Sequence, residues 1–238
     1  MSTYSKDEII KKLEVAKSEM WKFYSQDFVN YRGKTSDKER YYYTEIIAKW
    51  LLDNIELFND IKMISRENSY KVDSHDGKIK NEKSGREEEI IAMKLFDFSQ
   101  NQGKVFDIIG KIIDYQTPLK DIQTDKAGKI DLLAYNENEK TLRILELKKP
   151  DSKETMLRCV LEAYTYLKVV DKAKLLKDFG LPENTKIKAC PFVFFGGEQH
   201  KEMKEIKDSR KNLEKLIEKL GVEVIYLKEE NGEYSIIK

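Results

Sequence analysis

Residues 128–148 read GKIDLLAYNENEKTLRILELK, and this stretch decides the fold. In two runs, 129–135 and 142–148, apolar and polar side chains largely alternate, and the polar segment 136–140 separates them. Alternation with a period of two is typical of β-strands, and a short polar turn between two such runs predicts a β-hairpin. The chain is therefore expected to fold around a sheet that contains this hairpin.

Two charged side chains, Glu146 and Lys148, end the second strand of the predicted hairpin. They lie two residues apart and so share one face of the strand with the apolar residues before them. Burying a carboxylate and an ammonium group there is unfavourable unless they are paired or bind a metal. Asp131, on the first strand, is expected within reach of Glu146. The alternatives are an edge-strand ion pair for Glu146 and Lys148, and a strand-start role for Asp131.

Two facing carboxylates at Asp131 and Glu146 would repel each other, and a divalent cation is the simplest way to neutralise them. Neither His nor Cys occurs near them in the sequence. Oxygen ligands alone favour Mg²⁺ or Mn²⁺ over zinc. Beside such a cation, Lys148 could hold a water molecule, or help to deprotonate it, for attack on a phosphodiester.

The hairpin lies within a longer series of predicted elements. Helical spacing of apolar residues predicts a helix over 87–100, and a β pattern broken by Gly110 follows at 105–118. After the hairpin, Asp151 with Glu154 forms a capping-box pattern that predicts a helix to about residue 170. The remaining predicted elements are helices at 172–179 and 201–220, and strands at 187–195, 222–228 and 233–237. The core order is therefore helix, three strands, helix, strand.

Gly128-x-x-Asp131 and Glu146-x-Lys148, in this order of elements, resemble the PD-(D/E)xK nuclease superfamily. The resemblance covers roughly residues 86–195, less than half of the chain. It implies an α/β (α+β) fold with a restriction-endonuclease-like αβββαβ core, in which helices flank a mixed central sheet. It also implies that the residues at Asp131 and Glu146 hold the metal ion and that Lys148 activates the attacking water.

Many members of that superfamily add a glutamate from the helix before the first strand. Here Glu87, Glu88 and Glu89 open that helix. Glu88 is in phase with the apolar stripe of the helix, so it is the predicted additional metal ligand and catalytic residue, with Glu87 as second choice. The alternative is that these acidic residues only stabilise the first turn of the helix through its dipole.

The helix after the second motif often carries a Gln-x-x-x-Tyr signature in the exonuclease-like branch of the superfamily. This chain has Glu162 and Tyr166 at that spacing, with glutamate in place of glutamine, and Arg158 four residues earlier. Residues spaced by four form one stripe on a helix, so Arg158, Glu162 and Tyr166 are the predicted nucleic-acid-binding residues. The alternative is an Arg158–Glu162 ion pair on a solvated face.

The N-terminal part of the chain is expected to be helical. Ser5 with Glu8 forms a capping-box pattern at the start of a helix predicted over residues 5–24. Ser36 with Glu39 forms a second such pattern, which predicts a second helix that packs against the first as an antiparallel pair.

The boundary between the two parts of the chain is predicted in the polar, turn-rich stretch 73–85. Residues 61–72 before it are expected to form a short strand. The predicted division is therefore an N-terminal helical segment, 1–72, and a PD-(D/E)xK nuclease-like domain, 86–238. The helical segment could contact nucleic acid or a partner protein.

Composition limits the compartment and the class of protein. The chain has 44 basic and 43 acidic residues, so no overall basic charge indicates a nucleic-acid partner. Cys159 and Cys190 lack metal-ligand spacing and are predicted to be buried free thiols, which suits a cytoplasmic location. No signal-peptide core and no apolar run of membrane-spanning length occurs, so no membrane partner is expected.

Together these patterns predict a cytoplasmic, Mg²⁺-dependent nuclease that hydrolyses phosphodiester bonds in nucleic acid, DNA rather than RNA. The near-zero net charge keeps a second interpretation open, a catalytically inactive nuclease-fold module that binds nucleic acid or a protein partner. A third is that the motif is accidental and the domain binds a small molecule. The chain has no P-loop, GxGxxG or GxSxG motif that would favour other chemistry. A homodimer remains possible under each interpretation.

Overall fold

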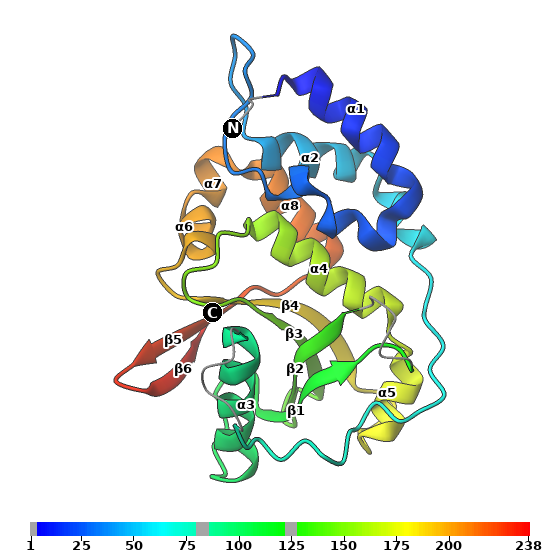
Figure 1. Cartoon of the computed structure of the whole chain (residues 1–238), viewed down its shortest axis with the longest axis vertical. Coiled ribbons are helices and arrows are strands. Elements are labelled where there is room, and N and C mark those ends of the chain that lie inside the picture. The colour runs from blue at the N-terminus through cyan, green and yellow to red at the C-terminus, as the bar shows by residue number, and fades with distance from the viewer. Residues whose placement is uncertain (1–3, 80–85, 122–127) are drawn as a thin grey trace.

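The computed structural model describes residues 4–79, 86–121 and 128–238 and has a mixed α/β fold (Figure 1). One six-stranded sheet contains the strands in chain order, β1 to β6. Strands β3 and β4, and β4 and β5, pair in parallel, while the other neighbours are antiparallel. The strands are β1 (Lys111–Pro118), β2 (Lys129–Asn136), β3 (Thr141–Leu147), β4 (Lys186–Phe194), β5 (Ile225–Glu230) and β6 (Glu233–Ile237).

Helices cover both faces of this sheet, and further helices form the N-terminal segment. The α-helices are α1 (Lys6–Ala16), α2 (Tyr43–Asp53), α3 (Glu87–Gln100), α4 (Met156–Val169), α5 (Lys172–Asp178), α6 (Glu198–Lys204), α7 (Ile206–Ser209) and α8 (Lys211–Leu220). Three 3₁₀ helices join the first elements, namely η1 (Lys17–Ser25), η2 (Asp27–Asn30) and η3 (Ile55–Asp60). The predicted helix over 87–100 is confirmed as α3.

The predicted hairpin is confirmed as β2 and β3. Leu133 lies opposite Ile144, and Tyr135 lies opposite Leu142. The β run predicted from residue 105 begins later, at β1, because Phe106 and Gly110 close a tight turn through two backbone hydrogen bonds of 2.9 Å. Every residue of β3 is buried, so β3 is a central strand of the sheet.

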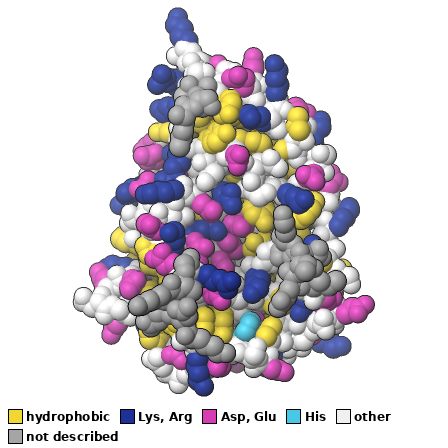
Figure 2. Space-filling model, viewed as in Figure 1, with side chains coloured by type: hydrophobic (Ala, Val, Ile, Leu, Met, Phe, Trp, Pro, Cys, Tyr) yellow, Lys and Arg dark blue, Asp and Glu magenta, His cyan; other side chains and the backbone are white. Residues whose placement is uncertain are grey.

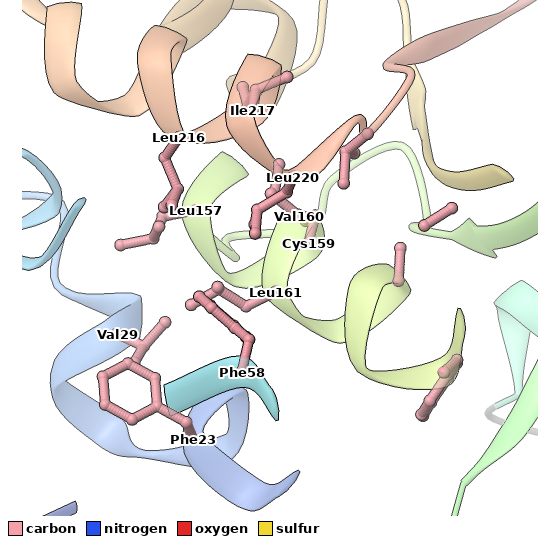
Figure 3. Packing of buried hydrophobic residues seen from close by; sticks show 14 of the residues in the cluster. Phe23, Val29, Phe58, Leu157, Cys159, Val160, Leu161, Leu216, Ile217 and Leu220 are labelled. Carbon is pink, nitrogen blue, oxygen red and sulfur yellow. The ribbon is translucent and has the colours of Figure 1, made fainter. Parts of the chain in front are cut away.

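The sheet separates two hydrophobic clusters. Leu145 and Leu147 of β3 pack with α3 on one face, while Ile144 packs with α4 on the other. In Figure 1, α1 and α2 form a further layer beyond α4. Figure 3 shows Leu157 and Leu161 of α4 among side chains from α8 and the N-terminal segment.

The N-terminal segment therefore shares a core with the sheet. Its buried residues, such as Ile9 and Leu51, belong to the same hydrophobic cluster as those of α4 and α8. The division into residues 1–72 and 86–238 stays a prediction, and the two parts are packed together rather than separated.

The first two helices run parallel, so the predicted antiparallel pair is wrong. Tyr43, at the start of α2, bonds to the backbone of Tyr4 next to the start of α1. Trp50, near the end of α2, donates to Glu14 near the end of α1 at 2.9 Å. The connection between the helices, residues 17–42, contains η1 and η2 and is long enough to return to the start of α1.

Local patterns also misplaced some boundaries in this segment. The Ser5–Glu8 capping box is confirmed, but the helix ends at Ala16, and Glu19 has non-helical backbone angles within η1. The capping pattern at Ser36 and Glu39 starts no helix, because α2 begins at Tyr43. The strand predicted over residues 61–72 is absent from that described stretch.

Tertiary contacts override two further predictions. Asp151 does not cap α4; instead Thr155 does, accepting a hydrogen bond from the Arg158 amide. The Thr155 hydroxyl in turn donates to the carbonyl of Val29, which fixes the start of α4 against η2. The helix predicted over 201–220 is divided into α6, α7 and α8.

Two properties predicted from composition can be compared with the structure. Cys159 and Cys190 are buried and free, as predicted. Within the described ranges, no helix is both long enough and apolar enough to cross a membrane.

The turn before β1 requires a glycine at Gly110. Its φ is +78°, and an added Cβ would lie 2.1 Å from the carbonyl oxygen of Tyr135. Gly103 also has a positive φ, +73°, but an added Cβ would meet nothing within 4 Å. Alanine at Gly103 would therefore introduce backbone strain alone, whereas alanine at Gly110 would introduce both strain and steric overlap.

We predict that Gly110→Ala lowers the free energy of unfolding by roughly 2–4 kcal/mol, the sum of left-handed strain and overpacking. Gly103→Ala should lower it by about 1 kcal/mol, since only the strain applies. Urea unfolding of both variants measures the difference. Equal losses in the two variants would contradict the close approach of Gly110 to β2.

Candidate metal and catalytic site

Three polar side chains form a row across the end of the sheet. The β1–β2 pairing brackets Gln116 and Asp131, and the β2–β3 pairing ends at Leu132 opposite Leu145, one residue from Asp131 and Glu146. Gln116 Nε2 donates to Asp131 Oδ1 at 3.0 Å, and the Leu147 amide donates to Asp131 Oδ2 at 2.9 Å. The structure therefore brings Asp131 and Glu146 together across the hairpin.

Lys148 lies next to this row and is surrounded by carboxylates. Its Nζ lies 2.8 Å from Glu146 Oε1, 2.9 Å from Glu162 Oε2 and 3.3 Å from Glu154 Oε2. Lys148 is 5% exposed and Glu146 is 4% exposed. The predicted common face of Glu146 and Lys148 is thus observed, and it is buried beneath α4 rather than solvated.

The polar stripe of α4 faces the same group. Glu162 is buried and pairs with Lys148, while Tyr166 Oη lies 3.4 Å from Glu162 Oε1. Arg158 pairs instead with Glu154, with an Nε–Oε1 distance of 3.1 Å. The alternative of an Arg158–Glu162 ion pair on a solvated face is therefore wrong, because Glu162 points inward to the buried ammonium.

Gly128 has a steric role next to this stripe. An added Cβ at Gly128 would lie 2.1 Å from Tyr166 Oη, so a larger residue would displace the phenol. The ring of Tyr24, from η1, lies edge-on to that of Tyr166 at a centroid distance of 6.1 Å. The glycine of the Gly128-x-x-Asp131 motif thus makes room for Tyr166, and η1 contributes a side chain to the site.

Glu88, in the first turn of α3, reaches the backbone just after the end of β3, as its position on the apolar stripe of the helix predicted. Its Oε1 accepts a hydrogen bond of 3.0 Å from the backbone amide of Lys149. Glu87 is exposed and lies 3.6 Å from the Lys149 ammonium at the surface. Of the two candidate glutamates, Glu88 is therefore the one directed toward the site, although its role as a ligand stays a prediction.

The acidic side chains shift one another's pKa values. Burial raises the pKa of Asp131 to about 7; the charges of Glu88 and Glu162 add to this shift, while Lys148 opposes it. Burial, together with the charges of Asp131 and Glu162, raises the pKa of Glu146 well above its usual value. Asp131 and Glu146 are therefore partly protonated near neutral pH unless a cation replaces the proton.

The same surroundings keep Lys148 charged. Burial alone would lower its pKa, but Glu146 and Glu162 outweigh that effect and raise the pKa well above its ordinary value. Lys148 is therefore an ammonium group at neutral pH, which can donate hydrogen bonds but cannot accept a proton.

Some members of the site were missed by sequence reasoning. Glu154 was interpreted as part of a helix cap, yet it contacts Lys148 and Arg158. Gln116 belongs to no motif, and the pairing of β1 with β2 is what brings it to Asp131. Tyr24 lies far away in sequence, and no local pattern links it to Tyr166.

Two observations bear on metal binding. In the part of the chain that the structure describes, Glu146 Oε2 is buried without a hydrogen-bond partner. Within the same residues, no three or more His, Cys, Asp or Glu side chains form a ready group of metal ligands. A cation would therefore need further ligands from water, backbone carbonyls or substrate.

The comparisons with known proteins give no relative for this chain. No family model, curated protein or solved structure matches it.

The raised pKa of Asp131 predicts a pH-dependent loss of stability in the metal-free protein. An acid with a folded-state pKa above its unfolded value destabilises the fold as pH rises from about 4 to about 7. Asp131→Asn should remove this penalty, so the variant gains on the order of 2 kcal/mol over the wild type at about pH 8.

Urea unfolding in EDTA at several pH values measures this gain, which should shrink toward pH 4. Asp151→Asn is the matched control, since Asp151 is exposed and the neighbouring Lys149 lowers its pKa. The control should show no gain at high pH. A pH-independent effect of Asp131→Asn would contradict the proposed origin of the shift.

Proposed function

We propose that this protein is a metal-dependent nuclease that hydrolyses phosphodiester bonds in nucleic acid, DNA rather than RNA. The observation that carries the proposal is the group formed by half-buried Asp131 and buried Glu146 and Lys148 at the end of two neighbouring strands. Glu88 and Glu162 add negative charge, so carboxylates outnumber the ammonium. Such an excess of buried acid serves no evident structural purpose and favours a bound cation.

The residues present fit a hard divalent cation such as Mg²⁺ or Mn²⁺. Asp131 and Glu146 would hold it, with Glu88 assisting, and Glu146 Oε2, which has no hydrogen-bond partner among the described residues, is a ready ligand atom. All these donors are oxygen atoms, which Mg²⁺ and Mn²⁺ prefer. When bound, the cation would stabilise negative charge on the phosphate and lower the pKa of a water molecule.

Lys148 is the residue proposed to position the attacking water. As a permanent ammonium it would donate a hydrogen bond to the water and stabilise the charge that forms, rather than remove a proton. Glu162 and Glu154 would hold this ammonium in place from the α4 side. Glu146 would contact both Lys148 and the metal ion, so the position of the ammonium and the binding of the metal would depend on the same carboxylate.

The order of elements supports a restriction-endonuclease-like core as the finer fold proposal. Helix α3 precedes β1, β2 and β3, and α4 leads from β3 to β4. The parallel pairing of β3 with β4 beside the antiparallel hairpin gives the mixed sheet that this proposal requires.

A second candidate function is a binding module without catalysis. It is favoured by the burial of Glu146 and Lys148 and by the carboxylate neighbours that Lys148 already has. The net charge of +1 also provides little general attraction for nucleic acid. The two candidates differ in whether a divalent cation binds and whether cleavage follows.

Lys148→Met should reduce Mg²⁺-dependent cleavage of DNA by roughly 100-fold or more, since it removes the group that positions the water. Cleavage of labelled single-stranded and duplex substrates measures the loss. Undiminished cleavage would exclude the role of Lys148, and absence of cleavage in the wild type would favour the binding module.

Because a buried charge is removed, thermal unfolding must accompany the assay. The variant retains Asp131 and Glu146, so Mn²⁺ should still raise its melting temperature. Loss of cleavage with this stabilisation retained would assign the defect to catalysis rather than to folding.

Neighbouring glutamates allow a matched test of the metal site. Glu88→Gln should weaken Mn²⁺ binding by about tenfold, since a carboxylate near the cation is lost. Glu87→Gln should leave affinity nearly unchanged, because Glu87 is exposed and its carboxylate lies 3.6 Å from the Lys149 ammonium at the surface. Calorimetric titration measures both. Equal affinities would exclude Glu88 from the metal site.

A further inference from the structure

One exposed aromatic side chain, Trp21, lies on the 3₁₀ helix that contributes Tyr24 to the site. Trp21 is 40% exposed. Side chains three residues apart point the same way in a 3₁₀ helix, so Trp21 and Tyr24 share one face of η1. Trp21 lies one turn, about 6 Å along the helix axis, from Tyr24.

Tyr24 connects this face of η1 to the candidate site. It shares a hydrogen bond with Tyr166, and burial followed by the charge of Glu162 raises its pKa. Tyr166 in turn lies against Gly128 and next to Glu162. Trp21 therefore lies near the edge of the site, while Tyr24 is part of it.

Two lysines accompany Trp21. The Nζ atom of Lys22 lies 4.3 Å from the centroid of the Trp21 ring, and that of Lys120 lies 5.9 Å from it. Lys120 comes two residues after Pro118, which pairs with Lys129 at the start of β2. We call Trp21, Lys22 and Lys120 the Trp21 patch.

The charges of the patch and the site are opposite. Lys22 and Lys120 are basic, whereas the site beside them holds buried carboxylates that repel phosphate. In the view of Figure 2, acidic side chains lie near the middle of the molecule, with basic and apolar side chains beside them. A nucleic-acid strand that reaches the acidic site would therefore be held at a basic edge.

We propose that the Trp21 patch binds an unpaired nucleobase and its flanking phosphates, so the protein prefers single strands or frayed ends to intact duplex. The indole offers a flat surface on which a base can stack when the Lys22 ammonium, now 4.3 Å from the ring centroid, moves to a flanking phosphate. A base inside a duplex has both faces covered and cannot stack there. The inference concerns the substrate of the proposed function, but binding needs neither a metal ion nor cleavage.

Binding is tested in EDTA with the full chain and three fluorescently labelled probes of equal length. These are an oligothymidylate strand, an abasic strand with the same phosphates, and a blunt duplex. Fluorescence anisotropy should show the oligothymidylate binding at least about fivefold more tightly than the abasic strand, since one stacked base contributes at least that factor. Equal affinities, or tightest binding of the duplex, would overturn the proposal.

Variants assign the preference to the patch. Trp21→Ala should abolish the difference between the oligothymidylate and abasic strands, and Trp21→Phe should retain part of it. Tyr41→Ala is the matched control, because Tyr41 is 39% exposed with Lys6 5.6 Å from its ring, and it lies on the segment before α2. Retention of the full preference in Trp21→Ala, or its loss in Tyr41→Ala, would overturn the assignment.

The lysines and the indole give separate signals. Lys22→Gln and Lys120→Gln should weaken binding of every probe and flatten its salt dependence, without changing the preference for bases. A Trp50→Phe background leaves Trp21 as the only tryptophan, so quenching of its emission by oligothymidylate reports contact directly. Lack of quenching would overturn stacking. Because these measurements contain no metal, a failed cleavage assay would count only against the nuclease proposal.

Discussion

The interaction on which the structure depends most is the contact of the Lys148 ammonium with the carboxylates around it. Glu146 comes from β3, Glu162 from α4, and Glu154 from the connection between them. Without the ammonium, Glu146 and Glu162 would face each other uncompensated where α4 packs on the sheet. Ion pairs this buried rarely stabilise a fold as well as apolar residues of similar size would. Their presence therefore favours a functional explanation over a structural one.

Other departures from a stable arrangement occur in the same row of residues. Gln116 has a φ of +50° within β1, unusual for a residue other than glycine, and its side chain donates to Asp131. Asp131 has a raised pKa, and Glu146 has a buried oxygen with no hydrogen-bond partner in residues 4–79, 86–121 and 128–238. Strain, unfavourable ionisation and an unsatisfied polar atom each destabilise the fold. Their concentration at one end of three strands is typical of a site whose chemistry opposes stability.

Local sequence patterns predicted what depends on neighbours along the chain. The alternation in 142–148 gave the shared face of Glu146 and Lys148, and helical spacing gave both α3 and the direction of Glu88. The cap of α4 was mispredicted at Asp151, because the hydroxyl of Thr155 is held by a carbonyl more than a hundred residues away in sequence. Burial of Glu162 was missed for the same reason: its partner lies on another element. Periodicity contains no information about such distant contacts.

The N-terminal segment is best understood as part of the site rather than as an appendage. Asn30 Oδ1 accepts from the Thr155 amide at 2.8 Å, so η2 fixes the start of α4. Tyr24, on η1, contacts Tyr166 further along the same helix. Between these two contacts α4 carries Glu162, which holds the Lys148 ammonium. Trp21 and Lys22 of the Trp21 patch lie on the same η1 helix, which reaches Glu162 through Tyr24 and Tyr166. One short path of contacts therefore joins the Trp21 patch to the buried charges.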